Sequence, residues 1–257
     1  MESIKFLGNL YDYSYDISDR GEIDYFQNIL DGLQLKIREI MRNLTTPCED
    51  FLKICHWKGV AVNCSKIFQL RRTFEGDCCT FNYFKITQDW WMRRDDFSNL
   101  THGEPGTQNG LSVLVNDEPE DYYCTVISSM GINVQVFIPG DYPDKASGGL
   151  IESICDIGSE NFLEVIPTTV AAVSDVMNHP VDKRQCLFEE EELTQFGVYS
   201  QSDCFVDCRM RSMMALCQCI PFTIPWSTDP TACTLRDLPC LNRYRGAGSA
   251  IRVIFVY

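Results

Sequence analysis

Seven of the fourteen cysteines of this 257-residue chain lie between Cys186 and Cys240, which is about a fifth of its length. Thiols at this density persist as disulfides in oxidising compartments, where they staple a chain into a rigid unit. A zinc site is the alternative, but its ligands usually include a C-x2-C pair or nearby histidines. This stretch has no C-x2-C pair, and the nearest histidine, His179, precedes it. The pattern therefore favours disulfides, and we expect no metal and no cofactor.

Three N-x-S/T sequons point in the same direction as the cysteines. They begin at Asn43, Asn63 and Asn99, and such triplets are glycosylated in secreted proteins. Met1 is followed by Glu-Ser-Ile-Lys rather than by a signal peptide. No run approaches the roughly 18 to 20 apolar residues that span a bilayer. The sequence therefore predicts an extracellular chain that is a fragment, missing sequence at one or both ends.

The composition is that of a folded chain with an acidic surface. Apolar residues make up 45% of the sequence, which suffices for a substantial core. Helical and strand-like patterns are mixed, so we expect an α+β fold. The net charge of −14 argues against binding to nucleic acid or to anionic lipid. It suits cations or a basic partner, although a dispersed negative surface serves solubility equally well.

Apolar periodicity predicts helices towards both ends of the chain. Between Gly21 and Leu44 apolar residues recur at three- and four-residue steps, which gives one apolar face. This face could pack within its own domain or against a partner helix in a coiled coil. The opening stretch, Met1–Arg20, is predicted to be irregular. Further helices are predicted over Glu49–Trp57, Glu189–Phe196 and Asp203–Leu216, the last with Ser202 as its N-cap.

The middle of the chain is predicted to be rich in strands. Gly110–Val115 is apolar and short, and Gly131–Ile138 alternates apolar with polar residues before Pro139 ends it. Phe162–Val173 is rich in β-branched residues and is also predicted to be a strand. The expected order is therefore a helical part, a β-rich part and a cysteine-dense helical part.

Sequence motifs of catalysis are absent. His56, His102 and His179 are the only histidines, and none lies in a nucleophile box or an H-E-x-x-H motif. The acidic run Glu189–Glu192 opens a predicted helix, where the helix dipole favours negative charge. We interpret it as a solvated helix start, with a cluster facing cations, protons or a basic peptide as the alternative. The protein is not expected to be an enzyme.

Short cysteine-containing segments resemble the degenerin/epithelial sodium channel family. Gly76–Asn82 is similar to the family's G-x-C-Y-T-F-N box, with Cys79 at the position of the tyrosine. Pro105–Leu111 resembles the glycine-rich turn and strand that follow this box. Cys48–Trp57, together with Cys64, is similar to the finger of the insect, pickpocket-like branch.

The cysteine-dense part resembles the thumb of the same family. Its order is Arg184–Glu190, then Tyr199–Ser200, then the pair Cys204 and Cys208, then Cys217-Gln-Cys-Ile-Pro-Phe222. The resemblance implies an extracellular domain shaped like a hand, one of three around a sodium-selective, amiloride-sensitive pore. It divides the chain into a helical finger region (1–75), a β-rich palm and β-ball region (76–183), a cysteine-rich thumb (184–245) and an unrelated tail (246–257).

The resemblance also implies disulfides. Cys217 would pair with Cys240, and Cys219 with Cys233. The family partners of Cys186, Cys204 and Cys208 would lie further along and are absent from this sequence. The partner of Cys78 would follow the first membrane helix, although Cys79 is an alternative bridging thiol. The pairing of the other cysteines stays open: Cys48, Cys55, Cys64, Cys124 and Cys155.

The expected function follows from this resemblance. The chain would be the extracellular portion of an amiloride-sensitive, ligand- or stimulus-gated sodium channel subunit at the plasma membrane. Its partners would be sodium ions and the other subunits of a homo- or hetero-trimer, and it would reach the membrane only through helices that it lacks. The braced thumb would pass a displacement to those helices. The alternative is a secreted disulfide-rich binding module or decoy without channel activity.

Overall fold

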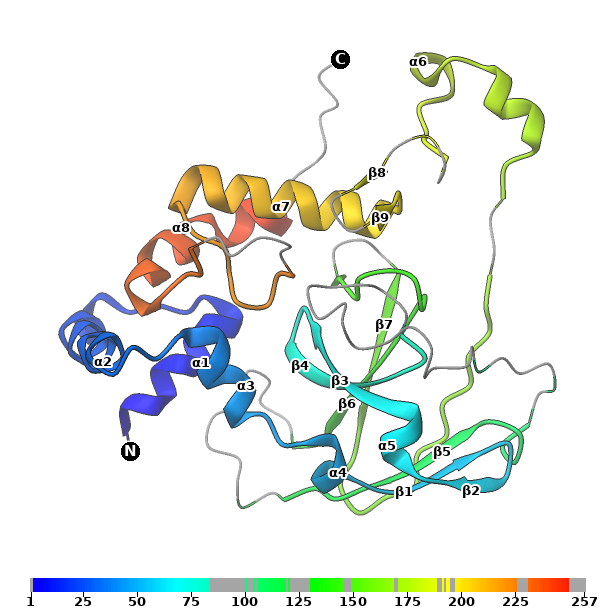
Figure 1. Cartoon of the computed structure of the whole chain (residues 1–257), viewed down its shortest axis with the longest axis horizontal. Coiled ribbons are helices and arrows are strands. Elements are labelled where there is room, and N and C mark those ends of the chain that lie inside the picture. Colours follow the sequence, from blue (N-terminus) through cyan, green and yellow to red (C-terminus); the bar gives the residue numbers. More distant parts are fainter. Residues whose placement is uncertain are drawn as a thin grey trace.

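The computed structural model describes residues 2–83, 100, 104, 106–118, 120, 130–145, 149–168, 171–188, 191, 193–194, 197–225 and 231–249. Helices from the two ends of the chain lie side by side, and strands from the middle lie next to them (Figure 1). The prediction of a mixed helical and β fold is therefore confirmed. The division into finger, palm, thumb and tail stays a prediction.

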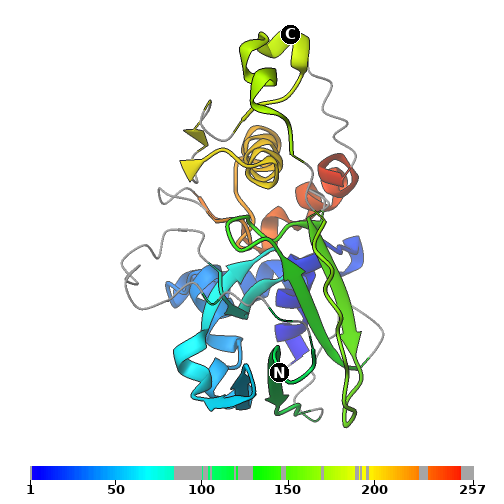
Figure 2. The same cartoon turned by 90° about the vertical axis from the view of Figure 1, so that its right-hand side faces the viewer.

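The helices of the described part form two main groups. The N-terminal group comprises η1 (Glu2–Ile4), α1 (Lys5–Asp12), η2 (Ile17–Asp19), α2 (Arg20–Gly32) and α3 (Ile37–Leu44). The C-terminal group comprises α7 (Gln201–Cys217), η6 (Leu235–Asp237) and α8 (Leu238–Ser249). Along the sequence, these groups are separated by strands and by four short helices of the described part: α4 (Cys48–Phe51), α5 (Cys64–Ile67), η5 (Ser174–Asn178) and α6 (Val181–Arg184). In Figure 2, α7 is seen nearly end-on, between the strands below it and the segment around α6 above it.

The described strands form four small antiparallel sheets. The largest has the order β2-β1-β5, from β1 (Leu52–Trp57), β2 (Val60–Val62) and β5 (Leu111–Val115). The others are hairpins of β3 (Phe68–Thr73) with β4 (Gly76–Phe81), β6 (Ile132–Phe137) with β7 (Leu150–Cys155), and β8 (Leu193–Thr194) with β9 (Gly197–Val198). The strands predicted over Gly110–Val115 and Gly131–Ile138 are confirmed as β5 and β6.

The sequence suggested an irregular opening stretch, Met1–Arg20, and this prediction is wrong, because η1, α1 and η2 together occupy most of it. Phe6, Leu7 and Leu10 are buried, which places one apolar face of the two-turn helix α1 in the core. A helix this short is marginal in isolation, so tertiary packing rather than propensity stabilises it.

The single helix predicted between Gly21 and Leu44 is wrong, because the chain breaks between α2 and α3. Gln34 adopts the left-handed conformation, with φ of 55°. The Leu35 amide donates to the Leu30 carbonyl and the Gln34 amide to the Asp31 carbonyl. These two bonds are the Schellman pattern of a helix C-terminus. The apolar periodicity continues across the break, which is why it concealed the turn.

Two further predictions of secondary structure are corrected between the helical groups. Glu49–Trp57 is one helical turn, α4, followed by β1, because pairing with both β2 and β5 overrides the short helical pattern. The described residues of Phe162–Val173 contain no strand and are mostly exposed. In the stretch predicted as a helix over Glu189–Phe196, the described residues 193–194 pair with 197–198 instead.

The C-terminal helix prediction is correct in kind, but its boundaries shift. Residues 203–216 lie within α7, and the N-cap is Ser200 rather than Ser202: the Ser200 hydroxyl accepts from the Asp203 amide at 3.2 Å. At the other end of this group, α8 continues to Ser249. No helix in the described part of the chain combines the length and apolar character needed to cross a bilayer.

The main hydrophobic core joins the two ends of the chain. Side chains of α1, α2 and α3 pack in one buried cluster with Phe222, which follows α7, and with Leu235 and Leu238 of the C-terminal group. Figure 1 shows the N-terminal helices, in blue, directly against the C-terminal ones, in orange and red. This core positions the cysteine-dense segment described next.

Candidate functional site

The cysteine-dense segment is held by two disulfides, and we call residues 201–241 the braced segment. Cys217 is bonded to Cys240, and Cys219 to Cys233. These are the two pairs that the family resemblance implies. Between Cys217 and Cys219 the chain changes direction at Gln218, which caps α7 in the left-handed conformation with φ of 56°. This change of direction lets two cysteines that are two residues apart reach different partners.

The two disulfides differ in their surroundings. Cys219 and Cys233 are 2% and 1% exposed and pack with Met213 and Leu241. Backbone hydrogen bonds flank this inner bridge: the Cys233 amide donates to the Ile220 carbonyl at 2.9 Å. The outer bridge, Cys217–Cys240, is only partly buried. The inner bridge is thus a core element, whereas the outer one is partly exposed to solvent.

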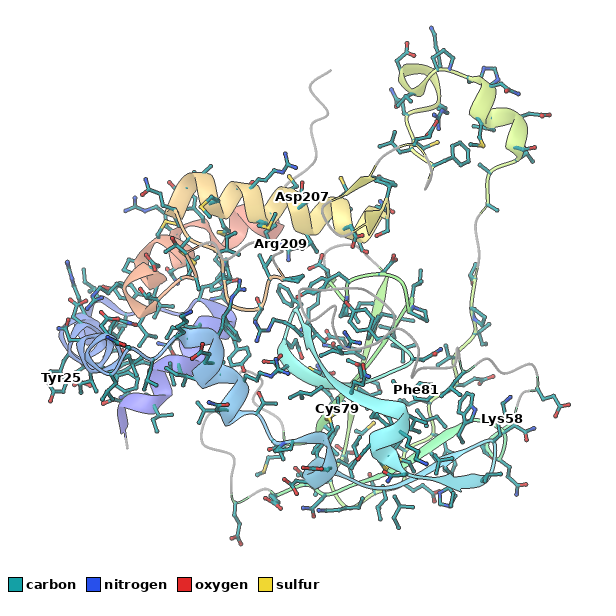
Figure 3. All side chains as sticks on the ribbon, viewed as in Figure 1. Tyr25, Lys58, Cys79, Phe81, Asp207 and Arg209 are labelled. Carbon is teal, nitrogen blue, oxygen red and sulfur yellow. A yellow bond between two sulfur atoms is a disulfide. The ribbon has the colours of Figure 1, made fainter. Side chains whose placement is uncertain are left out.

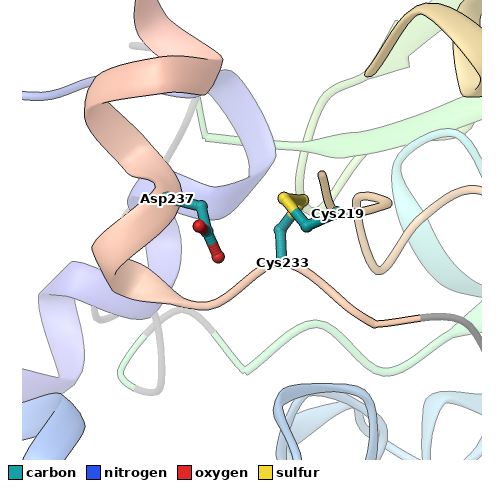
Figure 4. A group of neighbouring side chains, drawn as sticks. All are labelled: Cys219, Cys233 and Asp237. Carbon is teal, nitrogen blue, oxygen red and sulfur yellow. A yellow bond between two sulfur atoms is a disulfide. The ribbon is translucent and has the colours of Figure 1, made fainter. Parts of the chain in front are cut away.

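Asp237 lies close to the inner disulfide but does not form a metal site with it. Ligand-type atoms of Cys219, Cys233 and Asp237 lie within 4.8 Å of one another (Figure 4). Both sulfur atoms are joined in the disulfide, so neither is a thiolate, which is the form that binds metal. The Asp237 carboxylate instead accepts from the Thr234 amide at 2.7 Å and the Thr234 hydroxyl at 2.9 Å, which caps η6.

Helix α2 contacts the braced segment through polar groups as well as through the core. Gln27, which is buried, accepts from the Leu235 amide at 3.1 Å and donates to Asp31 at 2.7 Å. Arg236 bonds Asp31 at 2.7 Å and Asn28 at 2.6 Å on the exposed rim. The hydrogen bond from Gln27, and after it the one from Arg236, holds the pKa of Asp31 below its usual value.

Two further contacts tie other N-terminal residues to the braced segment. The Asn242 side chain, just beyond that segment, donates to the Tyr13 carbonyl at 2.8 Å, and Arg38 donates to the Ile224 carbonyl at 3.3 Å. Burial of the Tyr13 phenol, partly offset by Arg209 and by a hydrogen bond with Thr223, raises its pKa to about 12. The phenol is therefore neutral throughout the physiological range.

A buried ion pair joins α7 to the segment between β6 and β7. Arg209, labelled in Figure 3, donates to both oxygens of Asp144, at 2.7 and 3.1 Å. The guanidinium also lies over the Phe74 ring, 5.4 Å from its centre. Next to the pair, the fully buried Tyr142 hydroxyl donates to the Thr223 carbonyl at 2.8 Å. Burial raises the pKa of Tyr142 well above its ordinary value, so it stays a donor.

A second polar network joins the two hairpins β3–β4 and β6–β7. Lys145 bridges the carboxylates of Glu75 and Glu152, and Asn133 donates to both of these carboxylates. Partial burial alone would lower the pKa of Lys145, but the two carboxylates outweigh it and raise that pKa. Burial would likewise raise the pKa of Glu152, but the hydrogen bonds from Asn133, Lys145 and Gln135 lower it.

The remaining cysteines include two bridges whose partners the sequence left open. Cys48 is bonded to Cys79. Cys55 is bonded to Cys64 across the β1–β2 hairpin. Free thiols in the described part include those of Cys78, Cys155, Cys186 and Cys208, whereas Cys124 lies outside the described residues. Cys204 is exposed on α7.

The thiol of Cys78 lies in a protected position. It is 3.2 Å from the Thr73 hydroxyl, and burial raises its pKa. A partly buried thiol with a raised pKa is poorly reactive.

Two of the three predicted glycosylation sites lie in the described part. Asn43 is exposed in the last turn of α3, and Asn63 is exposed between β2 and α5. Asn99 lies outside the described residues, as do His102 and part of the acidic run Glu189–Glu192.

Comparison with known proteins points to one protein family. The family model "Amiloride-sensitive sodium channel" matches residues 5–250. The chain is 29% identical to sodium channel protein Nach of Drosophila melanogaster, over 86% of this chain and 43% of that protein. It is 26% identical to pickpocket protein 28 of the same organism, over 80% of this chain and 39% of that protein.

A more distant relative is the γ subunit of the human epithelial sodium channel, at 20% identity over 84% of this chain and 30% of that subunit. The chain thus spans less than half the length of these three relatives. The family is one of ion channels, not of enzymes. Because the family match covers nearly the whole chain, and the insect relatives are the more similar ones, the chain belongs to the amiloride-sensitive sodium channel family, in its insect pickpocket-like branch.

Proposed function

We propose that this chain is the extracellular portion of an amiloride-sensitive, stimulus-gated sodium channel subunit, and that its pore helices come from sequence outside the described residues. The observation that carries the proposal, beside the family membership, is the braced segment. Two disulfides and a shared core make it a stiff element in contact with the N-terminal helices. A stiff element with contacts on several sides is suited to transmit displacement.

The path of such a displacement is proposed to run through the contacts of the braced segment. A movement of α2 would displace η6 through the hydrogen bond between Gln27 and the Leu235 amide. The disulfides would pass it to α7, and the Arg209–Asp144 pair would pass it on to the segment before β7. In this proposal residues 1–75 are the finger, 76–183 the palm and β-ball and 184–245 the thumb of a hand-like domain, with 246–257 as a tail.

The assembled channel is proposed to be a homo- or hetero-trimer at the plasma membrane, with this chain on its extracellular side. Sodium ions are the permeating species. Nach of Drosophila and the human epithelial channel γ subunit are sodium channel proteins by name, and their similarity to this chain supports this assignment.

The test is a recording of the longest transcript product that contains this chain, expressed in oocytes alone and with pickpocket relatives. We expect a sodium current that amiloride blocks, and altered gating when Cys219 and Cys233 are both changed to Ser. The matched control changes Cys55 and Cys64, whose bridge lies outside the braced segment. Surface expression of the longer product without any current in either setting would contradict the proposal.

A second function, a secreted binding module or decoy, is favoured by one observation. The described part holds four disulfides, a density typical of small secreted binding modules. If the chain acts in this way, it should be secreted alone and change the current of a co-expressed relative. Recovery of the chain only as part of a longer membrane protein would decide against it.

A further inference from the structure

The sequon at Asn63 is built into a disulfide-bonded hairpin. Asn63 is exposed and caps α5, because its side-chain oxygen accepts from the Ser65 amide at 2.9 Å. A glycan would attach to the side-chain nitrogen, Nδ2, which leaves that oxygen free to remain the cap. The folded structure is therefore compatible with a glycan at this position.

The middle residue of the same sequon is held in the core. Cys64 is 8% exposed, is bonded to Cys55, and packs in a buried cluster with Leu52 and Ile67. The glycosyltransferase must take up Asn63, Cys64 and Ser65 together as an accessible triplet. Once the disulfide has placed Cys64 in the core, the glycosyltransferase can no longer bind the three residues together.

The order of the residues along the chain favours early closure of this disulfide. Cys55 precedes Cys64 by nine residues, so it has already been synthesised when the sequon emerges. Closing a loop of about ten residues takes only about 10–100 ns, so the slower thiol–disulfide exchange sets the rate of closure. The Cys48–Cys79 disulfide cannot close this early, because Cys79 follows Cys48 by 31 residues and is synthesised after the sequon.

Asn43 provides an internal comparison. It is exposed in the last turn of α3, and its sequon contains Leu44 and Thr45 rather than a cysteine. Neither neighbour can be withdrawn by a disulfide, so only the folding of α3 limits access to this sequon.

We propose that Asn43 and Asn63 are both N-glycosylation sites, and that closure of the Cys55–Cys64 disulfide limits the occupancy of Asn63. In the native setting this inference rests on the proposed extracellular function. Two reactions compete for the same triplet. Glycosylation forms a bond from Asn63 Nδ2 to the sugar C1, breaks the C1–O bond of a lipid pyrophosphate donor and releases the Nδ2 proton.

Disulfide closure uses a disulfide-bearing oxidoreductase as the oxidant. One thiolate of Cys55 or Cys64 attacks the donor disulfide, and the other displaces the donor as a dithiol, so two electrons leave the hairpin. The product buries Cys64, whereas the glycosylated sequon still permits the disulfide to form later. The order of events therefore decides whether a molecule carries the glycan.

The experiment uses the whole chain with the substitution Asn99→Gln, expressed in insect cells behind a cleavable secretion leader. Intact mass before and after removal of N-glycans counts the glycans per molecule, and peptide mapping assigns them. We expect a mixture of one- and two-glycan molecules in which Asn43 is the more occupied site. Cys55→Ser should shift the mixture towards two glycans, and so should brief exposure of the cells to a thiol reductant. Cys48→Ser, the matched control, should leave the occupancy of Asn63 unchanged.

Occupancy is fixed during synthesis, so the readout does not depend on how stably the Cys55→Ser variant folds. Three outcomes would each overturn the inference. One is full occupancy of Asn63 in the parent chain, and another is an unchanged mixture in Cys55→Ser. The third is that Asn43 or Asn63 carries no glycan in both the parent chain and Cys55→Ser. Because the added leader delivers the chain to the secretory pathway, the result is separate from the current measurement that tests the proposed function.

Discussion

At the scale of single residues, the Asp144–Arg209 pair is the most heavily buried interaction between charges in the described part. The Asp144 side chain is 0% exposed and that of Arg209 is 10% exposed. Two buried charges lose their hydration, and the bidentate geometry offsets this loss only while both partners are present. Their main role is therefore to fix how α7 sits on the segment before β7, rather than to add net stability.

Asp144→Asn should be strongly destabilising, because it leaves the Arg209 charge buried without its counterion. We expect a loss of about 3–5 kcal/mol in urea unfolding, and partial recovery in the double variant Asp144→Leu with Arg209→Met. Arg211→Met is the control on the same helix, since Arg211 bonds Asp207 with 76% of its side chain exposed and should cost less than about 1 kcal/mol. Equal losses in Asp144→Asn and Arg211→Met would contradict this account.

The raised pKa of Tyr13 predicts that the free energy of unfolding depends on pH in the alkaline range. Because burial raises its folded pKa from 10.0 to about 12, its contribution to stability is fully present below pH 10 and is lost as the pH rises to about 12. The loss should reach up to about 2 kcal/mol, since the residue is not wholly removed from water. Urea unfolding of the parent and of Tyr13→Phe between pH 9 and 12 checks this. The parent should lose more stability than the variant, and parallel curves would show that Tyr13 is not responsible.

At the scale of elements, the break between α2 and α3 depends on Gln34 in a conformation that costs a residue with a Cβ about 1–2 kcal/mol. Gln34→Gly should therefore raise the free energy of unfolding by about 0.5–1 kcal/mol. In a continuous helix the same change would lower it by about 1 kcal/mol, so the sign distinguishes the two structures. Gln34→Ala is the control, and it should change little because alanine has the same left-handed strain. The measurement is again urea unfolding.

Elements with a clear local pattern could be predicted from the sequence, and elements defined by distant partners could not. The helix α7 and the strands β5 and β6 follow from periodicity and end signals in their own residues. The strand β1 does not, because its six residues also fit a helical face and only pairing with β2 and β5 makes them a strand. The two turns of α1 are likewise defined by Leu235 and Leu238, more than 200 residues away.

The candidate site was predictable to a similar degree. The braced segment and the partners of its four cysteines were expected from the family resemblance, not from spacing alone. The Cys48–Cys79 bridge could not be predicted, since adjacent residues of a strand point to opposite faces and the position of Cys48 in the fold brings it to Cys79. The Arg209–Asp144 pair gave no signal, because it joins residues 65 positions apart.

At the scale of the whole molecule, the inner disulfide supports a core built from both ends of the chain. Replacing Cys219 and Cys233 by Ala should cost about 2–4 kcal/mol in thermal or urea unfolding. Since Leu235 and Leu238 follow this bridge and pack on α1, amide exchange should also become faster at Phe6, Leu7 and Leu10. The control, Cys55→Ala with Cys64→Ala, should leave exchange in α1 unchanged. Equal protection of α1 in all variants would show that the two ends open independently.

The shared core also sets a waiting time during synthesis. Phe6 and Leu238 are 232 positions apart, and ribosomes add roughly 5–20 residues per second, so about 10 to 50 s separate their appearance. Throughout that interval the apolar side of the first helix has no native surface to cover it, and we expect it to be prone to aggregation unless a chaperone binds it. Any product that stops before Leu235 would leave that side uncovered permanently.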